Sequence, residues 1–223
     1  MKIALIQQKC TNNRELNRHK GLEAVRKAAD QGAKVICFAE LSFDPFYPQI
    51  IATSDKLKLA EPIPGPTTEM FSGLAQDLDI VIILNLFERD GEHTVAICYD
   101  RHYTEYMRAL ALNGAEIVFV PQAGAVGEWP RGLYEAELQV AAFQNGFFTA
   151  LCNRVGEESK LTFSGGSFIC NPDGKVIVRA DEGKDQILLS DVDLNKVKES
   201  FAKQLFIPNR RPELYADWLS KTK

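Results

Sequence analysis

The sequence predicts a single α/β domain, and three observations lead to this fold class. Short, almost entirely apolar runs alternate with longer segments in which apolar residues recur at helical spacing. The links between these segments are short, which favours sheets packed against helices. The 223 residues are 45% apolar, and no low-complexity linker or internal repeat divides them, so we expect one domain over residues 1–223.

The elements of the first half follow a regular order. Strands are predicted at 2–7, 34–39 and 80–84, and they alternate with helices at 14–31 and 67–78. The strands are short apolar runs, whereas the helices repeat apolar residues at helical spacing. Asn12 or Asn13 is placed to cap the first helix, Thr67 or Thr68 can cap the second, and Gly32 ends the first.

A hairpin and a short strand are predicted in the middle of the chain. Asp90-Gly91 is a typical hairpin turn, so a strand is expected on each side of it. Residues 95–98 supply only a brief strand. A helix follows over 104–113 and is stopped by Gly114.

The second half repeats the same pattern. Strands are predicted at 116–120, 147–152, 166–170, 176–179 and 186–192. A helix is predicted at 133–145, and the tail after 195 is expected to be helical. Pro121 is expected to stop the first of these strands, because proline has no N–H for a sheet ladder. Asn171-Pro-Asp-Gly174 is typical of a type I turn.

Charge and cysteine spacing exclude several classes of protein. The 26 basic residues are scattered among 30 acidic ones, and the net charge is −4, so nucleic acid is not an expected partner. The first apolar run is too short for a signal peptide or a membrane span. The five cysteines form no C-x-x-C pair, which suits reduced thiols better than a disulfide framework or a zinc site. We therefore expect a cytoplasmic protein that neither enters a membrane nor holds a metal.

Cys98 is the first candidate for chemistry. It ends an apolar strand and precedes a helix, so its side chain is expected at an elbow where backbone N–H groups and the helix dipole lower a thiol pKa and stabilise an oxyanion. The alternative is a small core residue. That interpretation is given to Cys10, Cys37, Cys152 and Cys170.

Glu40 has the same placement as Cys98, at the end of an apolar strand. A carboxylate there must meet a partner, solvent or a substrate, since burying it alone costs free energy. Beside a thiol it would act as a general base whose pKa is raised by partial burial, and the alternative is a capping or surface acid. His102 could also face Cys98, but in cysteine–histidine hydrolases the two residues lie on different elements, so it is the weaker candidate.

Six segments of the chain resemble the motifs of one known family. Phe38-Ala-Glu-Leu-Ser-Phe43 and Ile97-Cys-Tyr-Asp-Arg-His102 resemble the two principal motifs of the nitrilase superfamily, the carbon–nitrogen hydrolases. Four supporting matches occur in the family's order at 108–121, 153–156, 165–168 and 171–174. The resemblance covers the chain from Met1 to about Trp218.

The resemblance implies a four-layer α-β-β-α sandwich and a Glu–Lys–Cys triad that hydrolyses amide, carbamoyl or nitrile C–N bonds. By position, Glu40 would be the general base and Cys98 the nucleophile that forms an acyl-enzyme or carbamoyl-enzyme. The backbone N–H of Tyr99 would donate to the oxyanion, and Glu105 and Arg108 would brace the elbow by ion pairing.

The resemblance also indicates substrate and assembly. It favours a linear amide or an N-carbamoyl amine over a nitrile, and it implies no cofactor. It further implies a homodimer or larger homo-oligomer, formed through the helices after the cysteine and the C-terminal tail.

The chain departs from the family pattern between its two principal motifs. Members of the family carry the catalytic lysine there, together with several dozen further residues. Here the sequence runs from Glu88 through Thr94 directly into Val95. We therefore predict that part of the sheet region, including the lysine, is missing between Thr94 and Val95.

No residue of this chain matches the family's lysine. Lys56 and Lys160 are the substitutes considered, and the motif requires neither. The loss of one oxyanion donor typically costs ~10²–10³ in rate. The alternative to an active hydrolase is therefore a catalytically silent protein with this fold that acts as a binding or interaction subunit.

Overall fold

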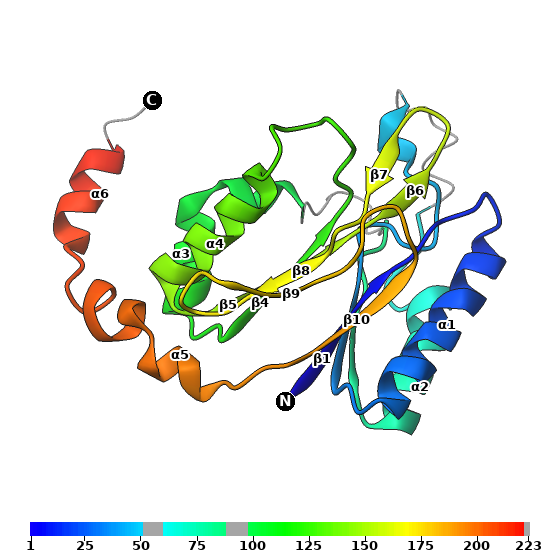
Figure 1. The fold of residues 1–223 in the computed structure, drawn as a ribbon, viewed down its shortest axis with the longest axis horizontal. Coiled ribbons are helices and arrows are strands. Elements are labelled where there is room, and N and C mark those ends of the chain that lie inside the picture. The colour runs from blue at the N-terminus through cyan, green and yellow to red at the C-terminus, as the bar shows by residue number, and fades with distance from the viewer. Residues whose placement is uncertain (51–59, 88–97, 221–223) are drawn as a thin grey trace.

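A computed structural model describes residues 1–50, 60–87 and 98–220, which contain two larger sheets with helices on their outer faces (Figure 1). The first sheet has the strand order β10-β1-β2-β3. Its strands are β1 (Lys2–Gln7), β2 (Val35–Phe38), β3 (Val81–Ile83) and β10 (Gln186–Asp191). β1 runs parallel to β2 and β2 to β3, whereas β10 pairs antiparallel with β1.

The second sheet has the strand order β4-β5-β8-β9. Its strands are β4 (Ile117–Gln122), β5 (Phe148–Asn153), β8 (Phe168–Cys170) and β9 (Val176–Arg179). β4 and β5 are parallel, and the remaining pairs are antiparallel. β3 and β4 are outer strands of their sheets in the described parts of the chain.

Alternation along the strands divides the core into three parts. On β1, Ala4 and Ile6 pack under α1 (Arg14–Asp30) and α2 (Pro66–Leu78). Ile3 and Leu5 point to the opposite side and pack against β5 of the second sheet.

The second sheet repeats this division, because its strands also turn alternate side chains to opposite faces. Val118 and Val120 pack under α3 (Thr104–Leu112) and α4 (Leu133–Asn145), whereas Phe148 and Ala150 face the first sheet. The order of layers is therefore helix, sheet, sheet, helix, which confirms the predicted four-layer sandwich. The prediction of one domain over 1–223 stays a prediction.

The remaining elements connect or follow this sandwich. They are η1 (Tyr47–Gln49), η3 (Tyr99–His102), the β6–β7 hairpin (Val155–Glu157 and Thr162–Ser164), α5 (Asn195–Glu199), η4 (Ala202–Phe206) and α6 (Pro212–Ser220). The hairpin was not among the predicted elements. In Figure 1, α6 stands apart from the sandwich, beyond α3 and α4, and none of its residues is buried.

Local signals set most of the element boundaries. Asn13 caps α1, its side chain accepting a hydrogen bond from the N–H of Leu16. The prediction that Thr67 or Thr68 caps α2 is wrong: Gly65 is the N-cap, and Pro66 begins the helix, where its fixed φ suits the first turn.

The remaining predictions concern the middle of the chain. Pro121 does not stop its strand, because β4 continues to Gln122. β4 pairs only with β5 among the described strands, and such an edge position tolerates a residue without an N–H. The hairpin at Asp90-Gly91, the missing segment between Thr94 and Val95, and residues 95–97 of the strand predicted at 95–98 lie outside the described residues, whereas Cys98 has helical dihedral angles at the start of η3.

Candidate active site

Glu40 and Cys98 line the same cavity, which has a volume of about 790 Å³. Glu40 follows β2, and Cys98 immediately precedes η3. Ala123, which follows β4, lies in the wall between them. The cavity is therefore at the carboxyl ends of parallel strands, where α/β folds commonly place their ligands.

Most of the remaining wall is apolar. Its side chains come from the loops after β2 and β3 and from the segments near 63, 126 and 161, and they include Phe46, Tyr47, Ile63, Leu86, Phe87, Val126 and Leu161. The polar residues of the described wall are fewer than the apolar ones, and they include Glu40, Asn85, Cys98 and Glu128. Such a site strengthens electrostatic interactions between the groups inside it.

The Glu40 carboxyl is mostly buried. Burial raises its pKa, while a hydrogen bond with the Cys98 thiol, the Arg154 charge and the backbone N–H of Ala123 each act to lower it. Its Oε2 atom is buried without a hydrogen-bond partner among the described residues. A carboxylate in this state is well placed to take up a proton, as a general base must.

The Cys98 thiol has a pKa raised to about 11, first by burial and then by the negative charge of Glu40. The N–H of Ala123 and the Arg101 guanidinium oppose this rise. The prediction that the elbow lowers the thiol pKa is therefore wrong, because loss of solvent outweighs the nearby donors. With this pKa the thiol holds its proton at neutral pH.

Arg101 holds the turn that carries Cys98. Its side chain donates to the carbonyl oxygen of Cys98 at 2.8 Å and lies 3.4 Å from Sγ. Its Nε bonds to Glu137 of α4 at 3.1 Å, and its guanidinium stacks on the Tyr134 ring. The sequence predicted a brace at this elbow and assigned it to the wrong side chains.

Glu105 and Arg108 were the residues predicted to brace the elbow. In the described structure neither forms an ion pair. Glu105 accepts a hydrogen bond from its neighbour Thr104, and the buried Nη1 of Arg108 has no described partner. Both lie on α3, whose first residues point away from Cys98 toward the groove beside α4.

His102 does not pair with Cys98. Its Nδ1 lies 2.7 Å from Glu137, and its ring packs against Tyr99 and Trp129. It lines a different cavity from the one that contains Glu40 and Cys98. The geometry therefore gives no support to a cysteine–histidine site.

Two backbone N–H groups belong to residues that line this cavity, Tyr99 and Ala123. Tyr99 is the first residue of η3, and the first N–H groups of a helical turn have no acceptor within it, so its role as an oxyanion donor stays a prediction. The N–H of Ala123 acts on both Glu40 and Cys98. Sequence reasoning missed Ala123, because nothing in its own segment indicates that the end of β4 faces the end of β2.

No lysine lines this cavity in the described parts of the chain. Lys160 is exposed in the turn between β6 and β7, and its backbone N–H bonds to Gln49. Lys56 lies outside the described residues. Among residues 1–50, 60–87 and 98–220, no cluster of side chains could hold a metal ion, and no helix has the length and apolar character to cross a membrane.

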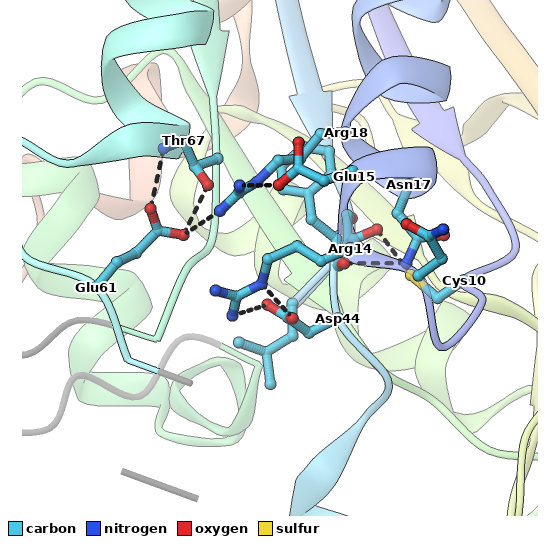
Figure 2. Close-up of polar contacts among 12 residues, drawn as sticks. Cys10, Arg14, Glu15, Asn17, Arg18, Asp44, Glu61 and Thr67 are labelled. Carbon is cyan, nitrogen blue, oxygen red and sulfur yellow. Dashed lines mark hydrogen bonds and ion pairs between the residues drawn. The ribbon is translucent and has the colours of Figure 1, made fainter. Parts of the chain in front are cut away.

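Buried ion pairs tie the loops of the cavity wall to α1 (Figure 2). Arg14 binds both carboxylate oxygens of Asp44, at 2.6 and 2.7 Å. Arg18 bonds to Glu61 at 3.1 Å, and Glu61 accepts from the hydroxyl and the N–H of Thr67 in the first turn of α2. Asp44 and Glu61 each lie close in sequence to wall residues, so this network fixes two sides of the cavity.

Comparison with known proteins identifies relatives along most of the chain. The model of the family described as "Carbon-nitrogen hydrolase" matches residues 2–95 and 90–200. An N-carbamoylputrescine amidase of Solanum lycopersicum is 27% identical over 281 positions, covering 96% of this chain and 93% of the relative. A beta-ureidopropionase of Arabidopsis thaliana is 27% identical over 263 positions, covering 85% of this chain and 64% of the relative.

Solved structures show the same fold. A carbon-nitrogen hydrolase from Helicobacter pylori superposes with a TM-score of 0.90 at 20% identity, covering 100% of this chain and 99% of that chain. An amidase of the nitrilase superfamily from Nesterenkonia superposes with a TM-score of 0.74 at 22% identity, covering 98% and 97%. The alignment with the Solanum relative is longer than this chain, so that relative contains residues without a counterpart here.

Proposed function

The chain belongs to the carbon–nitrogen hydrolase family, and from this premise we propose that it hydrolyses a linear amide or an N-carbamoyl amine through a cysteine-bound intermediate. The observation that carries this proposal is that the Glu40 carboxyl and the Cys98 thiol line one mostly apolar cavity. A carboxylate that can remove a thiol proton is the minimum that such a nucleophile needs.

The first half of the reaction releases the amine. Glu40 takes the thiol proton as Sγ of Cys98 bonds to the carbonyl carbon, and the carbonyl oxygen becomes an oxyanion to which the N–H of Tyr99 donates. Protonated Glu40 then gives its proton to the leaving nitrogen as the C–N bond breaks. Ammonia or an amine leaves, and an acyl or carbamoyl group remains on sulfur.

The second half restores the enzyme. Glu40 removes a proton from water, whose oxygen attacks the thioester carbon, and the C–S bond breaks as the thiolate recovers a proton from Glu40. The raised pKa of Glu40 suits this shuttle, because burial makes the carboxylate a stronger base than a solvated one.

The comparisons support the substrate class and the nucleophile. Two of the relatives are named for substrates that carry an N-carbamoyl group or its ureido equivalent. A Nesterenkonia amidase structure is described as showing covalent addition of the acetamide moiety of fluoroacetamide at the active-site cysteine. Both properties are transferred to this chain as part of the proposal.

The missing lysine sets the expected rate. The described cavity wall contains no lysine, and the two segments of the family match meet at residues 90–95, which supports a missing segment at that position. Without the charged donor, we expect turnover ~10²–10³ slower than a complete triad would allow.

The test is ammonia or amine release from a panel of linear amides and N-carbamoyl amines. Cys98→Ala should abolish release, whereas Cys170→Ala, which also removes a thiol whose pKa burial raises to about 11, should retain it. Intact mass during turnover should show one acyl or carbamoyl adduct, which the Cys98 variant lacks. Release that survives Cys98→Ala would refute the mechanism, and a folded protein that turns over no substrate would favour the silent binding subunit.

We also propose that the chain forms a homodimer or larger homo-oligomer in the cytoplasm. Exposed apolar side chains gather on α3, α4 and the C-terminal segment, and they include Leu112, Leu133, Val140, Phe143, Phe201, Leu205, Tyr215, Trp218 and Leu219. A groove of about 980 Å³ runs between these elements, and apolar patches of this kind mark interaction surfaces. All five cysteines are free thiols, which supports the cytoplasm.

The oligomeric state is measured by light scattering. We expect at least twice the mass of one chain, and Val140→Glu, which places a charge on this surface, should reduce it. A protein that is monomeric at every concentration would refute the assembly.

A further inference from the structure

We propose that Arg154 is a positioning residue for Glu40, which fixes the loop behind the general base so that its carboxylate faces Cys98. This inference rests on the proposed function of the same site. Arg154 is among the largest fully buried side chains, and it directly follows β5 of the second sheet, whereas Glu40 follows β2 of the first. The guanidinium therefore reaches from one sheet to the loop of the other.

The contacts of Arg154 go to the backbone of that loop. Its Nη1 donates to the carbonyl oxygens of Glu40 at 2.9 Å and Leu41 at 2.5 Å, and its Nη2 donates to that of Asp44 at 2.9 Å. Only an arginine offers such a fork of donors, because a lysine presents a single point charge. The side chain thus holds the peptide units on both sides of the turn that leaves β2.

This turn contains a conformation that needs support. Leu41 has a φ of 48°, the left-handed region that costs a residue with a Cβ about 1 kcal/mol or more. Its N–H donates to Oδ1 of Asn85 at 3.1 Å, and its carbonyl accepts from Arg154. Both backbone polar groups of this strained residue are therefore held by side chains from other segments, and its conformation turns the chain immediately after Glu40.

The guanidinium is itself held in place on its remaining sides. It forms an ion pair with Glu158, and it lies between the rings of Phe46 and Phe163, at 5.7 and 5.1 Å from their centroids. The second oxygen of Glu158 accepts from the N–H of Phe46 at 2.7 Å and from Gln49 at 3.2 Å. Arg154 and Glu158 therefore act as one brace for the base and for the cavity wall.

Arg154 acts on Glu40 through the main chain, because its hydrogen bond to that residue goes to the carbonyl oxygen and not to the carboxylate. Its charge also opposes the rise that burial causes in the pKa of Glu40. Loosening the brace should therefore both misplace the carboxylate and weaken its influence on the thiol, which distinguishes a positioning residue from one that only stabilises the fold.

The experiment compares Arg154→Lys with Arg179→Lys. Arg179 is a matched control, because it also pairs with a glutamate and stacks on a phenylalanine, Phe168, but it does so at β9. For Arg154→Lys we expect kcat to fall about 10²-fold with KM within threefold, the cost typical of a reacting group misplaced by about 1 Å. Arg179→Lys should leave both values unchanged.

Alkylation of Cys98 gives a readout that needs no turnover. The pH midpoint of alkylation by iodoacetamide should lie near 11 in the wild type and in Arg179→Lys. It should be lower in Arg154→Lys, because the displaced Glu40 charge no longer raises the thiol pKa. In a Glu40→Gln background, Arg154→Lys should cause no further shift.

The outcomes separate the inference from the proposed function. If the wild-type protein turns over no substrate but the pH midpoint of Cys98 alkylation is still lower in Arg154→Lys, the proposed function is refuted and the positioning role is supported. Unchanged kcat and midpoint in Arg154→Lys, or a shift that persists in the Glu40→Gln background, would overturn the positioning role alone. If Arg154→Lys does not fold, Glu158→Gln carries the test, with a smaller change in the same direction expected and a wild-type kcat and midpoint overturning the proposal.

Discussion

The two candidate catalytic residues line the same cavity, but the chain holds them in different ways. Cys98 is braced by Arg101, three positions further along the same turn, and by Glu137 of the neighbouring α4. Glu40 is braced by Arg154, which comes from the other sheet. Cys98 is thus positioned by local structure, and Glu40 by the packing of the two halves of the sandwich.

This difference determines what can disturb each group. A change within the turn or α4 acts on Cys98 through Arg101, whereas a change in how the sheets pack acts on Glu40 through Arg154. Both groups share one electrostatic feature, since burial raises the pKa of each and a nearby arginine opposes that rise. The two arginines therefore have similar electrostatic effects, Arg101 on Cys98 and Arg154 on Glu40.

The largest expected effect comes from removing the base itself. Glu40→Gln should lower kcat/KM by ~10²–10⁴, the usual contribution of a general base. The same substitution removes the charge that raises the thiol pKa, so the pH midpoint of Cys98 alkylation should fall below about 11. A variant with less turnover and a more acidic thiol would show that Glu40 acts on Cys98 as a base.

Thermal unfolding is the control for this variant. The melting temperature should not fall, because ionised Glu40 is buried with Oε2 unpartnered among the described residues and its loss leaves the brace of Arg154 intact. Wild-type turnover in folded Glu40→Gln would contradict the assignment of the base.

A smaller effect is expected at the brace of the nucleophile. Glu137→Gln removes the charged partner of Arg101, whose side chain is 2% exposed, and should lower the free energy of unfolding by about 1–3 kcal/mol. Turnover should fall several-fold because the Cys98 turn loosens. Urea unfolding and initial rates measure the two quantities.

Glu135→Gln, on the same helix, is the matched control, and it should have the smallest effect on the free energy of unfolding. Glu135 pairs with Arg179 at the surface, where the two side chains are 35% and 40% exposed, and exposed pairs contribute up to about 1 kcal/mol. Equal losses of stability in the two variants would show that burial of Arg101 does not distinguish the pairs.

Much of the fold follows from local patterns that the sequence displays. The apolar runs at β1 and β2, the cap at Asn13 and the helix Leu133–Asn145 were all predictable, because each depends on residues close to one another. The β6–β7 hairpin was not, because its strands are short and lack regular alternation of polar and apolar residues. Phe163 of β7 is buried, and its ring contacts Phe46 and the Arg154 guanidinium outside the hairpin.

The candidate site shows the same division between features that local sequence indicates and features that depend on tertiary contacts. The sequence by itself indicated which residues are the candidates for catalysis, since Glu40 and Cys98 each follow or end an apolar run and lie in motifs that resemble those of a known family. Only the tertiary structure decided that they share a cavity, that the thiol pKa is raised, and that Arg101 and Arg154 hold them. Burial and contacts between separate sheets cause these properties, and neither is a property of residues that are neighbours in the chain.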